Sequence, residues 1–342
     1  MRCGSGSRGV RRYAARLVVA LALVVLAAGC GTSPAPPASG AVRADVVGPP
    51  QITANAATAP LPAGTPGVGK PAVVIGTKDF SEQFLLGDLY AQALRAKGFT
   101  VTLDQNVGDS EIIDSAFASN QIQMYPEYLG EIASGLALAP AGGTALATYQ
   151  QAAQFEQAQR AATILLQTPY QNTDVLVVRR DLADRYGLRS VPDLAKIGPG
   201  GSGVRVAAQP PFRTRQNGLV GMAQVYGLSN VQFLAVGPDE TYGALEAGQA
   251  QVADGFSTDA QLTSGDFVEL DDPQNIFGFQ YVAPVVKQAT IAAQGPEFAQ
   301  TCNWVSSLLT VSEIRAMNQQ VQLGGADEAT VATQFLTRHG LR

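Results

Sequence analysis

Two basic and three aromatic residues are the side chains in this sequence whose positions suggest chemistry. Lys78 and Arg215 each lie in a polar loop after a predicted strand, and Tyr125, Tyr128 and Phe256 follow two other predicted strands. Lysine and arginine bind carboxylates through charged hydrogen bonds, and aromatic faces hold cationic groups. Together these side chains suit a small zwitterion.

Each of these residues also has a plainer interpretation. Lys78 could be a solvated loop lysine, and Arg215 could make structural bonds at the start of a helix. Tyr125 precedes a proline directly after a strand, which favours a place in the core. Tyr128 favours a pocket, and Phe256 fits a pocket wall and the core equally well.

The chain lacks the residues that most enzyme and metal sites need. Its single histidine is His339, near the end, which excludes histidine triads and histidine metal clusters. The segment 198–203, GPGGSG, follows a helical pattern and precedes a strand, the reverse of a dinucleotide site. We therefore predict no metal and no cofactor. An enzyme using Asp174, Glu131 and Asp259 is the weaker alternative.

Charge and cysteine content narrow the possible partners. The chain holds 23 Lys and Arg against 28 Asp and Glu, and five of the arginines lie within its first 16 residues. The remainder has no basic stripe, so nucleic-acid binding is not expected. Cys3 and Cys30 lie near the start, which leaves Cys302 alone in a helical stretch. We expect it to be a buried core thiol.

The first 30 residues have the pattern of an export signal. Arginines precede the apolar run LVVALALVVLAA, which is too short to span a bilayer. The run leads into L-A-A-G-C and resembles a bacterial lipobox, which predicts a signal peptide over 1–29 and lipid attachment at Cys30. An ordinary cleaved signal with an incidental cysteine is the alternative. Residues 30–70, rich in Pro, Ala and Gly, are expected to form a tether on the outer face of the cell membrane.

The elements that must position these side chains occur twice. The segment RAKGFTVTLDQNVGDSE begins at Arg95, and the similar QVYGLSNVQFLAVGPDE begins at Gln224. Two α/β units of one plan predict two lobes and a cleft, although any two βαβ units look partly alike. Ligands in such sheets bind beyond the carboxyl ends of the strands.

Strands alternate with helices through the rest of the chain, which predicts mostly parallel sheets. We expect lobe one at 71–174, lobe two at 175–280 and a C-terminal return to lobe one at 281–342, with hinges near 172–174 and 279–283. Asp79 and Glu82 predict a capping box at the start of a helix. We expect strands near 72–76, 100–104, 122–124, 175–179, 204–208, 231–235, 251–254, 267–270 and 282–286, and helices near 81–97, 110–119, 144–167, 181–187, 213–226, 240–247, 296–309, 312–323 and 327–338.

Several stretches resemble one family of proteins. VVIGTKDFSEQFLLGDLYAQAL, MYPEYLG, NTD, GFSTDA and APVV are spread over 72–286. They are similar to the substrate-binding proteins of ABC importers for glycine betaine, choline and related quaternary-ammonium osmoprotectants. The resemblance implies an α/β, periplasmic-binding-protein-like type II fold with two lobes and a hinged cleft. It also implies a monomer that delivers its ligand to ABC permease subunits.

The same resemblance suggests ligand-binding residues. Lys78 and Arg215 match the family's carboxylate partners, and Tyr128 matches a tyrosine of the box around the trimethylammonium group. Elsewhere the pattern departs from the family. Asp174 and Phe256 replace tyrosines, and either Gln280 or Tyr281 replaces another aromatic wall.

These departures matter for the ligand. A cation–π contact contributes about 0.5–2 kcal/mol, so losing two aromatic walls could weaken betaine binding by about 10-fold or more. Asp174 could instead pair with a cation that carries N–H donors. We therefore expect weak glycine betaine binding or a preference for another small polar solute.

Overall fold

The computed structural model describes residues 59–138, 143–237 and 240–341 of the chain. All of them belong to one compact unit, Val47–Arg342. The predicted signal peptide, Cys30 and residues 30–58 of the predicted tether lie outside the described residues.

Five strands form the first sheet: β1 (Val73–Gly76), β2 (Val101–Asp104), β3 (Met124–Tyr128), β4 (Ala162–Ile164) and β10 (Val282–Lys287). Their order is β2-β1-β3-β10-β4. β1 runs parallel to β2 and β3, and β10 runs antiparallel to β3 and β4. The strand that arrives from late in the chain, β10, therefore lies next to the centre of the sheet.

Five strands form the second sheet: β5 (Asp174–Arg179), β6 (Arg205–Ala208), β7 (Gln232–Ala235), β8 (Val252–Phe256) and β9 (Phe267–Leu270). Their order is β7-β6-β8-β5-β9. β6 runs parallel to β7 and β8, and β5 runs antiparallel to β8 and β9.

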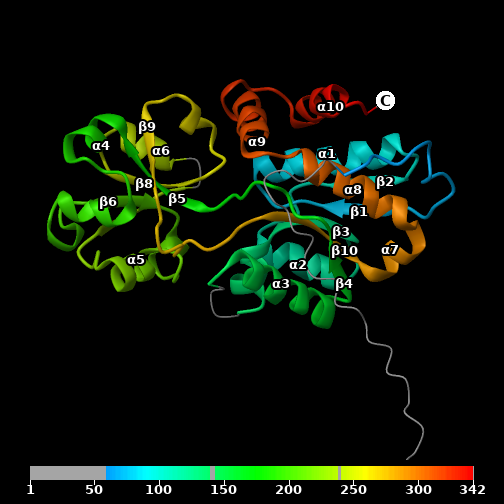
Figure 1. Cartoon of the computed structure of the whole chain (residues 1–342), viewed down its shortest axis with the longest axis horizontal. Helices are drawn as coiled ribbons and strands as arrows, with labels where there is room; N and C mark the ends of the chain where they lie inside the picture. Colours follow the sequence, from blue (N-terminus) through cyan, green and yellow to red (C-terminus); the bar gives the residue numbers. More distant parts are fainter. Residues whose placement is uncertain (1–58, 139–142, 238–239, 342) are drawn as a thin grey trace, which may run out of the picture. The chain divides into compact units, whose positions relative to one another are not determined.

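The two sheets have the same plan. In each, three parallel strands are followed by one antiparallel strand that arrives across a connection from the other sheet, and then by an edge strand. Residues 165–173 and 271–281 make these two connections (Figure 1). Both sheets are mixed, and in each of them four strands run in one direction and one runs against them. The two long connections reverse one strand in each sheet.

Helices cover both faces of each sheet (Figure 1). On the first sheet, α1, α8 and α10 enclose one core, and α2 and α3 enclose another. On the second sheet, α4 and α5 cover one face and α6 covers the other. The helices are α1 (Ser81–Ala96), α2 (Ser110–Ala118), α3 (Ala145–Arg160), α4 (Arg180–Tyr186), α5 (Leu219–Tyr226), α6 (Thr241–Glu246), α7 (Gln288–Gln294), α8 (Pro296–Leu308), α9 (Val311–Asn318) and α10 (Glu328–Arg338).

Shorter helical turns fill several connections. Those with 3₁₀ geometry are η2 (Val191–Lys196), η3 (Pro199–Gly201), η4 (Pro210–Arg213) and η5 (Ala260–Thr263), and those with π geometry are η1 (Glu131–Leu136) and η6 (Gln319–Leu323). Cys302, predicted to be a core residue, is buried beside α1 and α10, and so is the neighbouring Trp304. Burial raises the pKa of the Cys302 thiol, which suits an inert core residue.

Several element predictions are corrected by the structure. The helix expected over 144–167 ends at Arg160, because Ala161 adopts a left-handed conformation (φ 49°) and leads into β4. The helix expected over 213–226 begins only at Leu219, after a 3₁₀ turn and a loop. The capping box expected at α1 is absent, because its N-cap is Phe80, without a side-chain cap.

The described part of the predicted tether packs against the folded body. Leu61 lies against the core beneath α1, and the Gly67 amide donates to the Lys97 carbonyl at 2.9 Å. A side chain at Gly67 would collide with Phe99, because an added Cβ would lie 2.4 Å from the ring. The tether prediction is therefore too long at its C-terminal end.

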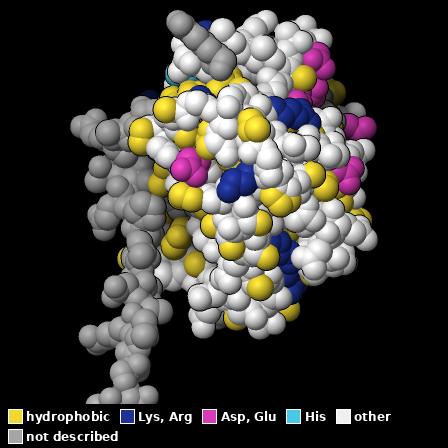
Figure 2. All heavy atoms as spheres, turned by 90° about the vertical axis from the view of Figure 1, so that its right-hand side faces the viewer, with side chains coloured by type: hydrophobic (Ala, Val, Ile, Leu, Met, Phe, Trp, Pro, Cys, Tyr) yellow, Lys and Arg dark blue, Asp and Glu magenta, His cyan; other side chains and the backbone are white. Residues whose placement is uncertain are grey.

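The apolar length of the helices and the distribution of charge on the surface are two further properties of the described residues. No helix within the described residues is long and apolar enough to cross a bilayer. On the face that Figure 2 shows, Lys and Arg side chains lie scattered among acidic and apolar ones. That face therefore offers no continuous basic surface for phosphates.

Candidate functional site

The segment Met124–Tyr128 forms β3, and all five of its residues are buried. Side chains alternate along a strand, so Tyr125 and Tyr128 point to opposite faces. Tyr125 packs edge-to-face on Phe117, with ring centroids 4.9 Å apart, and is a core residue as expected. Tyr128 stacks on Phe80, with centroids 6.1 Å apart.

Lys78 follows β1 and turns inward rather than toward solvent. Its Nζ lies 2.5 Å from Glu127 Oε1 and 4.9 Å from the centroid of the Tyr128 ring. The Lys78 side chain is 6% exposed and the Glu127 side chain 0%. Burial raises the pKa of Glu127 to about 7, and the Lys78 charge works against this shift. Lys78 is therefore part of a buried ion pair, and a ligand carboxylate would have to share it with Glu127.

Two carboxylates and one aromatic ring share a face of the second sheet. Asp174 opens β5 and lies opposite Phe256 in the antiparallel register, while Asp254 lies opposite Leu176. Because alternate residues along a strand point the same way, Asp174, Asp254 and Phe256 all lie on one face. Asn217 donates a hydrogen bond to Asp174 Oδ2 at 3.5 Å. The Oδ1 atom of Asp254 is buried and has no hydrogen-bond partner among the described residues.

Arg215 is a positively charged residue that lowers the pKa of both Asp174 and Asp254. It lies in the turn between η4 and α5, and its side chain is exposed. Burial raises the pKa of Asp174 to about 7, Arg215 opposes the shift and Glu131 adds to it. Burial, then Asp174, raise the pKa of Asp254 well above its ordinary value. The face is thus short of positive charge, which a cationic ligand could supply.

Gln280 and Tyr281 lie beside η1. Gln280 is 8% exposed, and its Oε1 accepts from the Glu131 backbone N–H at 3.1 Å. It approaches Gly130 so closely that an added Cβ would lie 2.7 Å from its carboxamide. Tyr281 is partly buried against the core between β3 and α3. Gln280 therefore braces the segment that bears Glu131, and the Tyr281 ring packs on the first sheet.

Asp259 holds the loop that follows β8. Its Oδ2 accepts from the Phe256 backbone N–H at 2.7 Å and from the Tyr242 hydroxyl at 2.8 Å. Gly255 leaves room for this arrangement, because an added Cβ would lie 2.8 Å from both oxygens. Burial raises the pKa of Asp259 to about 6. Both partners are structural, so this carboxylate orients Phe256.

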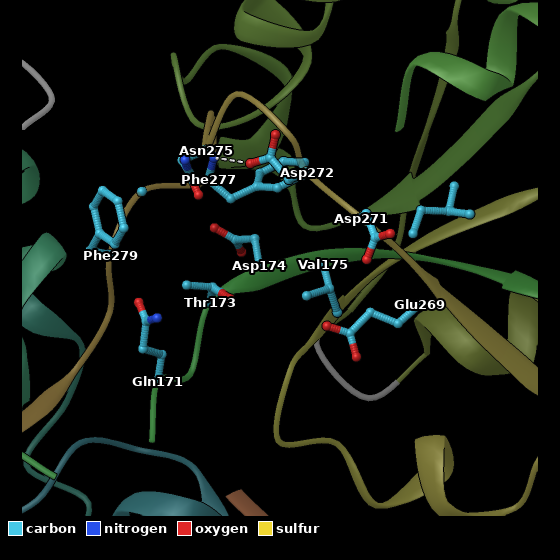
Figure 3. A pocket seen from close by; sticks show the side chains of 12 residues that line it. Gln171, Thr173, Asp174, Val175, Glu269, Asp271, Asp272, Asn275, Phe277 and Phe279 are labelled. Atoms are coloured by element: carbon cyan, nitrogen blue, oxygen red, sulfur yellow. Dashed lines mark hydrogen bonds between the residues drawn. The ribbon is translucent and has the colours of Figure 1, made fainter. Parts of the chain in front are cut away.

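A cavity of about 190 Å³ lies where the two connections meet the second sheet. Figure 3 shows the Asp174 carboxylate among Gln171, Thr173 and Phe279, opposite Phe277. Of the seven candidate residues, only Asp174 lines this cavity. A second cavity of about 590 Å³ lies elsewhere, where the end of α3 meets α7.

Sequence reasoning missed three acidic residues near the candidates: Glu127, Asp254 and Glu82. Glu127 lies two residues after Tyr125, and Asp254 lies two residues before Phe256. Because alternate residues of a strand point to the same face, the sequence could have placed each carboxylate on the same face as its aromatic neighbour. Glu82 was assigned to a helix cap, but it is 2% exposed and lies against Tyr128. Among the described residues, no group of His, Cys, Asp and Glu is arranged to hold a metal ion.

Residues 71–338 match the family model described as the substrate-binding domain of ABC-type glycine betaine transport systems. The chain is 26% identical over 294 residues to the glycine betaine-binding protein YehZ of Escherichia coli, covering 83% of this chain and 94% of that protein. It is 29% identical over 277 residues to a glycine-betaine-binding protein of Pseudomonas aeruginosa, covering 78% and 88%. These relatives are matched over most of their length.

The fold is similar to a solved structure titled glycine betaine/carnitine/choline ABC transporter. The TM-score is 0.69 at 23% identity, over 79% of this chain and 99% of that chain. The predicted α/β, periplasmic-binding-protein-like type II fold is confirmed.

Proposed function

The chain belongs to the family of substrate-binding domains of ABC-type glycine betaine transport systems, and from this premise we propose that it captures a small cationic solute by hinged closure. It is a substrate-binding protein and not an enzyme, and it works with permease subunits outside the cytoplasm. The observation that carries the proposal is the family match across 71–338, a span that contains both sheets.

Closure requires two lobes that move against each other. We assign 71–174 with 281–342 to one lobe and 175–280 to the other, joined by the two connections. The identical strand plan of the two sheets supports this division. A solute that contacts both lobes stabilises the closed form, which the permease then recognises. The protein acts as a monomer.

Lipid attachment at Cys30 is a second part of the proposal. Its support is the arginine-rich start, the short apolar run and the L-A-A-G-C sequence. Two or more acyl chains would hold the protein firmly on the outer face of the cell membrane. Mass spectrometry of the purified protein is expected to show a diacylglycerol-modified Cys30 at the N-terminus, and a free Cys30 would contradict it.

The chemistry around Asp174 favours a cation with N–H donors over a pure betaine. Asp174 and Asp254 are acceptors that lack a full set of donors, and Asp254 Oδ1 is buried without one. A trimethylammonium group has no hydrogen to donate, so it leaves such acceptors unsatisfied. A solute with an N–H-bearing cationic group satisfies them. Glycine betaine is therefore expected to bind weakly.

A thermal-shift screen followed by calorimetry tests the function. The panel contains glycine betaine, choline, carnitine, proline and polyamines. A solute that binds only the folded protein raises the melting temperature as its concentration increases. We expect at least one cationic solute to do so and to bind more tightly than glycine betaine. A flat response to every solute would contradict the proposed function, and micromolar glycine betaine binding would contradict the ligand preference.

Exchanging Asp174 for an aromatic should shift the preference toward betaines. In Asp174→Tyr, the carboxylate gives way to a ring on the Phe256 face of the sheet. One added cation–π contact contributes about 0.5–2 kcal/mol, so glycine betaine should bind about 10-fold more tightly. Calorimetry measures the change, with the exposed Asp184→Tyr on α4 as control. Equal affinities in the two variants would show that residue 174 does not meet the cation.

A further inference from the structure

The buried side chain of Glu82 accepts five hydrogen bonds from different parts of the fold. It is the second residue of α1 and is 2% exposed. Its Oε1 accepts from the Tyr128 hydroxyl at 3.0 Å, from Asn172 Nδ2 at 2.9 Å and from the Tyr170 hydroxyl at 3.4 Å. Tyr128 belongs to the first sheet, while the other two donors belong to the first connection.

The second oxygen of Glu82 accepts from different parts of the chain. Thr258, in the loop after β8 of the second sheet, donates to Oε2 from its Oγ1 at 2.6 Å. Asn318, at the end of α9, donates to the same oxygen from its Nδ2 at 2.9 Å and to the Thr258 carbonyl at 3.0 Å. One carboxylate therefore joins elements of both sheets, the connection between them and the C-terminal helices.

Burying a carboxylate is costly unless donors replace its water shell. Here five donors do so, and the N-terminus of the 16-residue helix α1 adds a favourable dipole. Five donors suit a group that only accepts. A glutamine of the same shape would keep one accepting oxygen and turn an N–H₂ group toward donors.

The loop that bears Thr258 is held on its other sides as well. The Ser257 backbone N–H donates to the Thr173 carbonyl at 2.9 Å, and Ser257 Oγ donates to the Gln171 carbonyl at 2.9 Å. Arg315 of α9 donates to the Ser257 carbonyl at 2.7 Å. This point of the second sheet is thus fixed to elements that pack on the first sheet, one residue from Phe256.

We propose that Glu82 is a positioning residue that makes the loop at 257–258 the pivot of closure. This inference rests on the proposed function. Glu82 holds the Tyr128 ring through its hydroxyl and holds the loop after Phe256 through Thr258. The two aromatic walls of the candidate site therefore keep one relative position while the rest of the second sheet turns about the pivot. Loosening this point lets Phe256 move away from Tyr128 and lowers ligand affinity.

Two variants test the pivot. Glu82→Gln reverses the polarity at one oxygen, and Thr258→Val removes only the donor from the second sheet. Both are expected to bind the tightest solute of the screen at least 10-fold more weakly, through faster dissociation. The matched control is Asp114→Asn on α2, which breaks the partly buried pair with Arg160 at the end of α3 (2.7 and 2.6 Å). It should lower the melting temperature but leave affinity within twofold.

Amide hydrogen exchange of the solute-free full chain provides a second readout. In both variants the Ser257 amide should exchange faster, while the amides of β6 keep their rates. If affinity falls by less than twofold and the Ser257 amide exchanges at the wild-type rate, Glu82 has only a structural role. That result would overturn the proposal. If the wild-type chain binds no solute, the proposed function fails, and the exchange result still decides the pivot. If Glu82→Gln does not fold, Thr258→Val decides both readouts.

Discussion

Replacing Lys78 with methionine is expected to lower the free energy of unfolding by about 3–5 kcal/mol, because it leaves a buried carboxylate without its partner. Glu127 is fully buried, and its Oε2 has no hydrogen-bond partner among the described residues. In the variant, Glu127 must lose its charge by binding a proton, so the loss should shrink toward pH 5. Urea unfolding at pH 5 and pH 8 measures both effects.

The double variant Lys78→Met, Glu127→Leu separates stability from binding. Replacing both members of a buried pair with apolar residues is often neutral, so most of the lost stability should return. If Lys78 also contacts a ligand carboxylate, affinity for zwitterionic solutes stays low in the double variant. Loss of less than 1 kcal/mol in the single variant would show that the pair contributes little.

The twin architecture was predictable because its signals are local and occur twice. Gly98 and Gly227 occupy equivalent places in the repeated segments, and both adopt the left-handed conformation, with φ of 83° and 68°. A glycine after an apolar helical stretch predicts a helix end, and alternation predicts the strand that follows. The positions of β1, β2, β6 and β7 follow from these patterns to within a residue.

The errors arise where tertiary structure overrides local pattern. The strand expected at 122–124 occupies Met124–Tyr128, so four of its five residues were expected in the loop that follows. All five are buried, so no alternation marks the strand, and Pro126 suggested an end. In the sheet Pro126 lies opposite Pro284. The left-handed Ala161 is likewise invisible in sequence, because alanine normally continues a helix.

The site was harder to predict than the fold, since its partners lie far apart in sequence. Lys78 and Arg215 were both expected to bind the carboxylate of a ligand, whereas in the structure Lys78 pairs with Glu127 and Arg215 acts on Asp174. Glu82 and Asn318 are 236 positions apart. Residue type and spacing can suggest that a lysine binds a carboxylate, but only the fold decides which one.

Stability should fall as pH rises from 5 to 8, because buried acids hold protons in the folded chain. Burial raises the pKa of Glu156 to about 8, of Glu127 and Asp174 to about 7 and of Asp259 to about 6, and it also raises that of Asp254. In the unfolded chain these groups titrate near 4. The folded chain therefore binds more protons than the unfolded chain in this window. Each additional bound proton lowers the free energy of unfolding by roughly 1.4 kcal/mol per pH unit.

Glu156 should make a large contribution to this pH dependence. It is 0% exposed, neither oxygen has a hydrogen-bond partner among the described residues, and burial dominates its shift. Asp114 and Glu127 raise its pKa further, while Arg160 and Lys287 lower it. Between pH 5 and 8 it should cost roughly 4 kcal/mol of unfolding free energy. Glu156→Gln should remove most of that difference in urea titrations, and an unchanged slope would contradict the assignment.

Ligand affinity should move in the opposite direction over the same window. Asp174 and Asp254 attract a cation only after losing their protons, so a cationic solute should bind more tightly at pH 8 than at pH 5, even though the folded chain is less stable there. With a raised pKa of about 7 at Asp174, the change should be about 10-fold or more. Calorimetry of Asp174→Asn at both pH values supplies the control, since this variant lacks the titrating group and should lose most of the dependence. Affinity that falls with rising pH in the wild-type chain would place the ligand's cationic group away from these carboxylates.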